Sequence, residues 1–359
     1  MFQSLADFLD SFLEMGIPWY DITVHQHGRQ IWRHSNGFLD PERTVPVAGN
    51  ERCNMYSCSK PITCAAALQL WEKGAFQLDD ALGRYLPEYE NMTVRTPDGS
   101  IVPAENKITI RHLFSMTAGF SYDMSVPSLL RCAKETGGVC PTREMIRALA
   151  SEPLQFEPGT DWSYSLCHDV LAAFVEVVSG EMFNDYLEKH IFRPLGMKRT
   201  TFLLPDSEVD TLAPQYWSGK DGIREGTKRR DPYVPGPGYA SGGAGCVSTL
   251  EDYILFADAL LRDGAVLKKD TIRMMCEPQM PEIGLRNFWI PGYTYGLGVR
   301  TPLPDSPATD FGWGGAAGAL LVVDPVRDVS AFYLQHVRES PNATMRTRIP
   351  EFLRDIPRG

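Results

Sequence analysis

Apolar residues recur at helical spacing close to the start of the chain. Their common face would hold Leu5, Phe8, Leu9, Phe12 and Leu13. A spacing of three and four residues is typical of an amphipathic helix with one buried stripe. Gly16 follows as a stop signal. The pattern therefore predicts a helix near the N-terminus that packs one face against a core.

Two segments at opposite ends of the chain have the residue pattern that is typical of β-hairpins. Near the N-terminus, residues 20–27 and 30–34 flank a glycine turn. Near the C-terminus, residues 319–323 and 329–334 are rich in β-branched and aromatic side chains and flank an Asp-Pro turn. Helical signals fill most of the sequence between them. This arrangement predicts one antiparallel sheet built from both termini.

The middle of the chain carries helical patterns broken by proline and glycine. Residues 57–74 predict one helix that ends at Gly74, and residues 169–180 predict another. Residues 216–245 are rich in glycine, proline and charge, which predicts a long loop of the kind that often covers a binding site. Pro350 weakens the prediction of a helix at the C-terminus.

Together these elements predict an α+β fold. We expect an α/β sandwich whose antiparallel sheet comes from both termini, with an all-helical region inserted in the middle. Residues 1–75 and 240–359 would form the sheet lobe. Residues 76–239 would form a mainly helical lobe with active-site loops. The active site would lie where the two lobes meet.

Composition narrows the choice of partners. Apolar residues make up 43% and charged residues 22% of the chain, which is ordinary for a globular protein. The formal net charge of −10 argues against a nucleic-acid partner. The sequence has no long apolar run and no leader-like start, so we expect a cytoplasmic protein without a membrane partner. The eight cysteines are scattered without a C-x-x-C pair, and we expect neither a metal nor a cofactor.

A serine and a lysine stand three residues apart at the start of the predicted helix 57–74. Ser57 and Lys60 would share one face of that helix. A serine hydroxyl is a poor nucleophile without a base beside it, and a lysine can be that base when burial lowers its pKa. A capped helix start with a surface lysine would give the same pattern. Ser59 is the rival nucleophile, although it lacks the three-residue spacing to Lys60.

This Ser-x-x-Lys segment resembles the first motif of the serine β-lactamases, the D-Ala-D-Ala peptidases and related esterases. Further segments resemble that family in the expected order along nearly the whole chain. They are 108–120 (ITIRHLFSMTAGF), 157–165 (EPGTDWSYS), 194–197 (PLGM), 241–249 (SGGAGCVST) and 313–318 (WGGAAG). The resemblance implies a β-lactamase/D-Ala-D-Ala-peptidase-like fold.

The resemblance also assigns roles to site residues. It implies that Tyr164 passes the Ser57 proton to the leaving group. Packing beside Trp162 is the alternative role for this tyrosine. The N–H groups of Ser57 and Ala316 would hold the oxyanion. Tyr122 is a further candidate for substrate binding.

Two departures from the family pattern bear on the substrate. Many relatives carry Asn two residues after the motif tyrosine, but this chain has Leu166. Trp313 stands where a Lys or His usually binds the substrate's carboxylate, and Gly314 and Gly315 leave room for close approach to the strand. This W-G-G version resembles the family VIII carboxylesterases and related acyltransferases, which implies ester substrates without that carboxylate. His168 would be a structural or supporting residue, with a general-acid role as the alternative.

We therefore predict a serine hydrolase that acts through an acyl-enzyme on small-molecule carboxylic esters. Transfer of the acyl group to an alcohol would occur where the alcohol outcompetes water. A β-lactamase or D-amino-acid peptidase of the same fold is the first alternative. A non-catalytic binding scaffold is the second alternative. The presence of Ser57, Lys60 and Tyr164 together argues against the scaffold, because a dead copy usually loses one of them.

Overall fold

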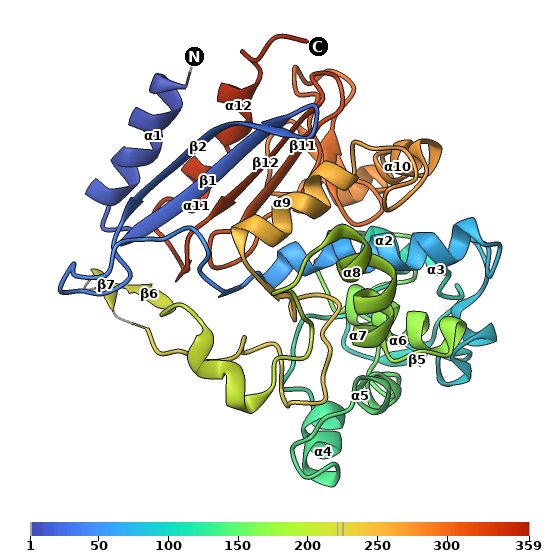
Figure 1. Ribbon diagram of the computed structural model, residues 1–359. Coiled ribbons are helices and arrows are strands. Elements are labelled where there is room, and N and C mark those ends of the chain that lie inside the picture. The colour runs from blue at the N-terminus through green and yellow to red at the C-terminus, as the bar shows by residue number, and fades with distance from the viewer. Residues whose placement is uncertain (1, 221, 225, 359) are drawn as a thin grey trace.

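A four-stranded antiparallel sheet forms the centre of this computed structural model, which describes residues 2–220, 222–224 and 226–358 (Figure 1). The strand order is β11–β12–β1–β2, so the C-terminal hairpin pairs with the N-terminal one through β12 and β1. The strands are β1 (Trp19–Gln26), β2 (Arg29–Gly37), β11 (Leu320–Asp324) and β12 (Val329–Leu334). The predicted sheet from both termini is confirmed.

Helices cover both faces of the sheet (Figure 1). On one face, α1 (Gln3–Glu14) buries the stripe that its sequence predicts and contacts α12 (Ile349–Leu353). On the other face, α9 (Leu250–Ala259) packs across β1, β11 and β12. Pro350 falls in the first turn of α12, where its missing N–H costs no hydrogen bond, so a short C-terminal helix does form.

The region between the hairpins is mostly helical. Its centre is the contact of α2 (Ser59–Glu72) with α6 (Cys167–Ser179), and α6 is followed by Gly180 in the left-handed conformation (φ 71°). A small hairpin of β4 (Thr93–Arg95) and β5 (Ile101–Pro103) interrupts the predicted all-helical region, because the chain turns back at an Asp-Gly pair. The helices are α2 (Ser59–Glu72), α3 (Ile110–Ser115), α4 (Pro127–Glu135), α5 (Thr142–Leu149), α6 (Cys167–Ser179), α7 (Phe183–Leu187) and α8 (Arg193–Leu195). Beyond this region lie α10 (Lys269–Met275) and α11 (Ala343–Arg346).

The prediction of a long loop over residues 216–245 is wrong for the first part of this segment. Strands β6 (Tyr216–Gly219) and β7 (Gly222–Arg224) form a hairpin there. Strand β6 also pairs in parallel with β13 (Val337–Arg338), more than a hundred residues away in the sequence. Such long-range pairing leaves no local signal. From residue 226 to 245 the described chain runs through turns and bends. The remaining strands are β3 (Cys53–Asn54), β4 (Thr93–Arg95), β5 (Ile101–Pro103), β8 (Val247–Ser248), β9 (Tyr293–Tyr295) and β10 (Arg300–Pro302).

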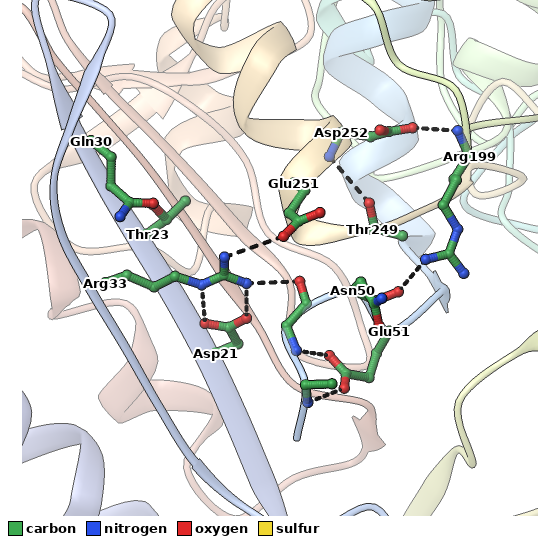
Figure 2. Close-up of polar contacts among 12 residues, drawn as sticks. Asp21, Thr23, Gln30, Arg33, Asn50, Glu51, Arg199, Thr249, Glu251 and Asp252 are labelled. Atoms are coloured by element: carbon green, nitrogen blue, oxygen red, sulfur yellow. Dashed lines mark hydrogen bonds and ion pairs between the residues drawn. The ribbon is translucent and has the colours of Figure 1, made fainter. Parts of the chain in front are cut away.

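A partly buried polar network fixes the chain just before β3 (Figure 2). Arg33 of β2 pairs with Asp21 of β1 at 2.8 Å and donates a second bond to the carbonyl oxygen of Gly49 at 2.7 Å. The Glu51 carboxylate accepts the N–H of Gly49 at 2.9 Å. Because this turn is tied to the sheet, the segment that follows it enters the site from a fixed position.

The division of the chain into a sheet lobe (1–75 with 240–359) and a helical lobe (76–239) stays a prediction. The sheet strands and α9 fall within the first set of residues, and α3 to α8 fall within the second. Within the described residues, no helix has the length and apolar character to cross a membrane.

Candidate active site

A tight turn delivers Ser57 to the start of α2. The chain leaves β3, passes through a 3-10 turn at Tyr56–Cys58, and enters α2 at Ser59. The predicted helix therefore begins two residues later than expected, and Ser57 lies in the turn. Tyr56 has a positive φ of 48°, which is unusual for a residue with a side chain. Its hydroxyl donates to Gln215 Oε1 at 2.7 Å, which helps to hold this conformation.

The two serines of this segment have different surroundings. Ser59 is fully buried, its hydroxyl donates to the carbonyl oxygen of Tyr56 at 2.6 Å, and its Oγ accepts the N–H of Cys246 at 2.8 Å. The Ser59 hydroxyl thus both donates to and accepts from backbone groups. Ser57 is half-buried and lines a cavity. Of the two, Ser57 alone is placed to meet a substrate.

Lys60 is fully buried and lies beneath Ser57. The contact between the two side chains is the one that their three-residue spacing predicts. The Lys60 Nζ is 3.3 Å from Ser57 Oγ, 3.3 Å from the Tyr122 hydroxyl and 2.6 Å from the carbonyl oxygen of Gly243. An ammonium group has three N–H donors, so these partners satisfy it. The same nitrogen lies 4.5 Å from the centre of the Tyr164 ring. The structure thus brings Ser57, Lys60, Tyr122 and Tyr164 together.

Burial changes the acid strength of Lys60. Loss of solvent lowers the pKa of its ammonium to about 8, although the charges of Asp169 and Asp231 act in the opposite direction. A pKa of about 8 leaves roughly a tenth of the lysine neutral at pH 7, against well under one per cent for an ordinary lysine. Lys60 can therefore accept a proton near neutral pH.

Tyr164 is held between aromatic rings and hydrogen bonds. Its ring stacks on Tyr122 at 5.4 Å and on Trp313 at 5.7 Å between centroids. Its hydroxyl accepts a bond from the Trp313 indole N–H at 3.1 Å and is hydrogen-bonded to Ser57. Burial raises the pKa of the Tyr164 phenol above its usual value. The phenol is therefore neutral at physiological pH, so its hydroxyl can both donate and accept a hydrogen bond.

The glycine-rich segment after β10 forms the wall opposite Ser57. Trp313, Gly314, Gly315 and Ala316 line the same cavity of about 350 Å³ as Ser57. A side chain at position 315 would meet the carbonyl oxygen of Met55 at 2.3 Å, so only glycine fits there. This close approach sets Ala316 beside the Ser57 turn. Ala316 itself is exposed.

His168 does not reach this cavity. It is fully buried, and its Nε2 lies 3.2 Å from the carbonyl oxygen of Phe114 and 3.5 Å from Cys64 Sγ. Burial lowers its pKa to about 3, so the ring is neutral at physiological pH. These contacts tie α6 to α2 and α3. Among the described residues, no cluster of three or more His, Cys, Asp and Glu side chains could hold a metal ion.

The structure adds groups that the sequence patterns do not single out. The Gly243 carbonyl falls within segment 241–249, but a backbone acceptor has no side-chain signature. Asp169 lies behind it, fully buried, and accepts the Ser241 hydroxyl at 2.6 Å. Trp289 stands at the cavity mouth with 57% of its surface exposed and packs edge-on against Tyr164 at 5.4 Å.

Comparisons with known proteins identify the family and the fold of this chain. The family model described as Beta-lactamase matches residues 6–352. Esterase EstB of Burkholderia gladioli is 29% identical over 341 residues, covering 87% of this chain and 84% of the relative. Acyltransferase calJ of Penicillium decumbens is 28% identical over 349 residues, covering 87% and 82%.

Solved structures share the whole fold. EstCE1, described as a hydrolase with promiscuous acyltransferase activity, superimposes with a TM-score of 0.77 at 28% identity and covers 99% of each chain. Unliganded simvastatin synthase (LovD) from Aspergillus terreus, as its selenomethionyl derivative, gives a TM-score of 0.80 at 23% identity, covering 97% of this chain and 96% of its own. The second likeness bears on the fold alone. With a family model spanning nearly its full length, this chain belongs to the Beta-lactamase family.

Proposed function

We propose that this protein is a serine hydrolase that cleaves carboxylic esters through an acyl-enzyme on Ser57. The observation that carries the proposal is the buried Lys60 ammonium 3.3 Å from Ser57 Oγ, with its pKa lowered to about 8. A base of that strength within reach of a serine is what nucleophilic catalysis requires.

In the first half-reaction, neutral Lys60 accepts the Ser57 proton as Oγ attacks the ester carbonyl carbon. The N–H groups of Ser57 and Ala316 stabilise the oxyanion. The tetrahedral intermediate collapses, the ester C–O bond breaks, and the Tyr164 hydroxyl donates its proton to the leaving alkoxide. Lys60 then returns a proton to the Tyr164 oxygen. The acyl group is left on Ser57.

In the second half-reaction, water attacks the acyl-enzyme. The proton of the attacking water passes to the Tyr164–Lys60 pair, and Ser57 Oγ leaves and is reprotonated. The acid product then departs. An alcohol in place of water follows the same steps and yields a new ester, which is acyl transfer. Relatives named as an esterase and as acyltransferases support both outcomes.

The residue two positions after Tyr164 favours ester substrates over amides. Leu166 is buried and offers no side-chain hydrogen bond to a substrate amide. A β-lactamase or D-amino-acid peptidase is therefore the weaker candidate. The contact of Lys60 with Ser57 and the open cavity also argue against a non-catalytic scaffold.

Turnover of matched substrates tests the proposal. We expect hydrolysis of aryl esters with acyl chains from about two to about six carbons, because the apolar cavity is of moderate size. We expect much slower opening of a chromogenic cephalosporin. Ser57→Ala should abolish ester hydrolysis and Ser59→Ala should not abolish it. Faster turnover of the cephalosporin than of every ester would refute the assignment of substrate class.

We further propose that the protein acts in the cytoplasm on small molecules and binds no nucleic acid. The net charge of −10 supports the second point, because phosphates would be repelled. Fractionation of the source cells tests the location. A gel-shift assay at low salt tests nucleic-acid binding, and a shift would contradict the proposal.

A further inference from the structure

A buried arginine stands in the wall of the catalytic cavity. Arg346 ends the short helix α11 and lines the same cavity as Ser57 and Gly314. Only 8% of the residue is exposed. Its surroundings include Tyr333 of β12 and Cys58, the residue after Ser57. A positive charge therefore lies in the wall of the cavity that holds the reacting serine, on the side of helix α11.

The Arg346 guanidinium has no partner within the part of the chain that the structure describes. No carboxylate lies within ion-pair distance there, and its Nε is buried without a hydrogen bond. Two other arginines in this region do have carboxylate partners. Arg300 lines the same cavity, but its charge is balanced by Asp310 at 2.7 Å. Arg348 pairs with Glu351 at 3.1 Å on the surface.

An unpaired buried cation is costly, so its retention in a cavity wall needs a reason. Burial lowers the pKa of Arg346, yet a guanidinium stays charged at neutral pH. Removal of such a charge from water is strongly unfavourable unless an anion or hydrogen-bond acceptors compensate. A planar guanidinium matches a carboxylate through two parallel hydrogen bonds. The missing compensation is what an anionic ligand in the cavity would provide.

We propose that Arg346 forms a carboxylate subsite, so that the preferred substrates are esters that also carry a free carboxylate. This inference rests on the proposed function. It revises the expectation that Trp313 leaves the site without an anchor for a substrate anion. The indole of Trp313 is engaged by Tyr164, and the cation comes instead from α11.

Two pairs of esters test the subsite. In the first pair the charge is on the acyl side: para-nitrophenyl monoadipate against the corresponding primary amide. In the second pair it is on the alcohol side: para-acetoxybenzoate against para-acetoxybenzamide. We expect kcat/KM to favour the acid in at least one pair by roughly 10- to 100-fold, the usual strength of a charge-assisted hydrogen bond. Higher salt should reduce this ratio.

Variants assign the preference to Arg346. Arg346→Met keeps a long side chain without the charge and should bring the acid-to-amide ratio to about one or below. Arg346→Lys should restore part of it. Arg348→Met is the matched control, since it removes one positive charge two residues away at an exposed position, and its ratio should equal that of the wild type.

Each outcome of these assays either supports or overturns the carboxylate subsite. Equal turnover of acid and amide in both pairs by the wild type overturns the subsite, even if Arg346→Met does not fold. An unchanged ratio in folded Arg346→Met overturns it as well. If no ester is cleaved, the proposed function fails. A thermal-shift assay with dicarboxylate and diamide ligands then tests the carboxylate subsite at Arg346 separately. Adipate should then stabilise the wild type more than adipamide does, and failure to do so rejects the subsite.

Discussion

The proton affinity of Lys60 makes a quantitative prediction. Its pKa of about 8 lies more than two units below that of an ordinary lysine, which corresponds to roughly 3 kcal/mol in favour of the neutral form. Because the neutral amine is the base, kcat/KM for an ester should rise about tenfold per pH unit below that pKa and level off above it. A lysine with an unshifted pKa would still be gaining activity at pH 9.

The Lys60→Arg variant removes the base and keeps the charge. Guanidinium does not deprotonate in proteins, so acylation should fall by roughly 10² to 10⁴, the usual contribution of a positioned base. Lys73→Arg is the matched control, because Lys73 is exposed just past the end of the same helix. The assay is stopped-flow release of nitrophenolate from pH 6 to 10, with thermal melting to show that each variant folds.

Two results would refute this reasoning. A wild-type profile that is flat between pH 6 and 9 would mean that no group with the pKa of Lys60 limits acylation. A folded Lys60→Arg variant with near-wild-type turnover would mean that the proton of Ser57 goes elsewhere. In either case Lys60 would be a structural residue held by the Gly243 carbonyl.

Other substitutions test the surroundings of the pair. Tyr164→Phe should melt like the wild type yet lose about 10²-fold or more in ester turnover, because only the hydroxyl is removed; normal turnover would make Tyr164 a packing residue. Asp169→Asn removes a charge that raises the pKa of Lys60, so the midpoint of the pH profile should move to lower pH; an unchanged midpoint would contradict the coupling. Gly315→Ala should lower the melting temperature by an amount equivalent to about 1–3 kcal/mol, because its Cβ would meet a backbone oxygen at 2.3 Å. Gly314→Ala, whose Cβ has its first neighbour at 3.6 Å, is the control, and equal melting of the two variants would refute the steric argument.

Much of the fold follows from local patterns. The alternation around the N-terminal glycine turn and the β-branched C-terminal segments predict the two hairpins, and the structure pairs them into one sheet. The three-residue spacing of Ser57 and Lys60 predicts their contact, because neighbours on a helical surface lie on one face. These features depend on residues close together in the sequence.

Other features depend on contacts between distant segments, which local patterns do not record. Strand β6 forms because Tyr216 meets Val337, and neither neighbourhood alone is a strong strand signal. The Gly243 carbonyl that holds Lys60 is a backbone group. Arg346 lies in a C-terminal stretch without a motif, and only the folded chain places it in the wall of the cavity that Ser57 also lines.

Covalent labelling of Ser57 tests the central claim most directly. The folded protein is treated with a fluorophosphonate, digested, and its peptides are analysed by mass spectrometry. One adduct is expected, on the Ser57 hydroxyl, lost in Ser57→Ala and retained in Ser59→Ala, because the Ser59 hydroxyl is buried and bonded to the backbone. Labelling of Ser59, or no labelling of folded protein, would contradict a nucleophilic Ser57.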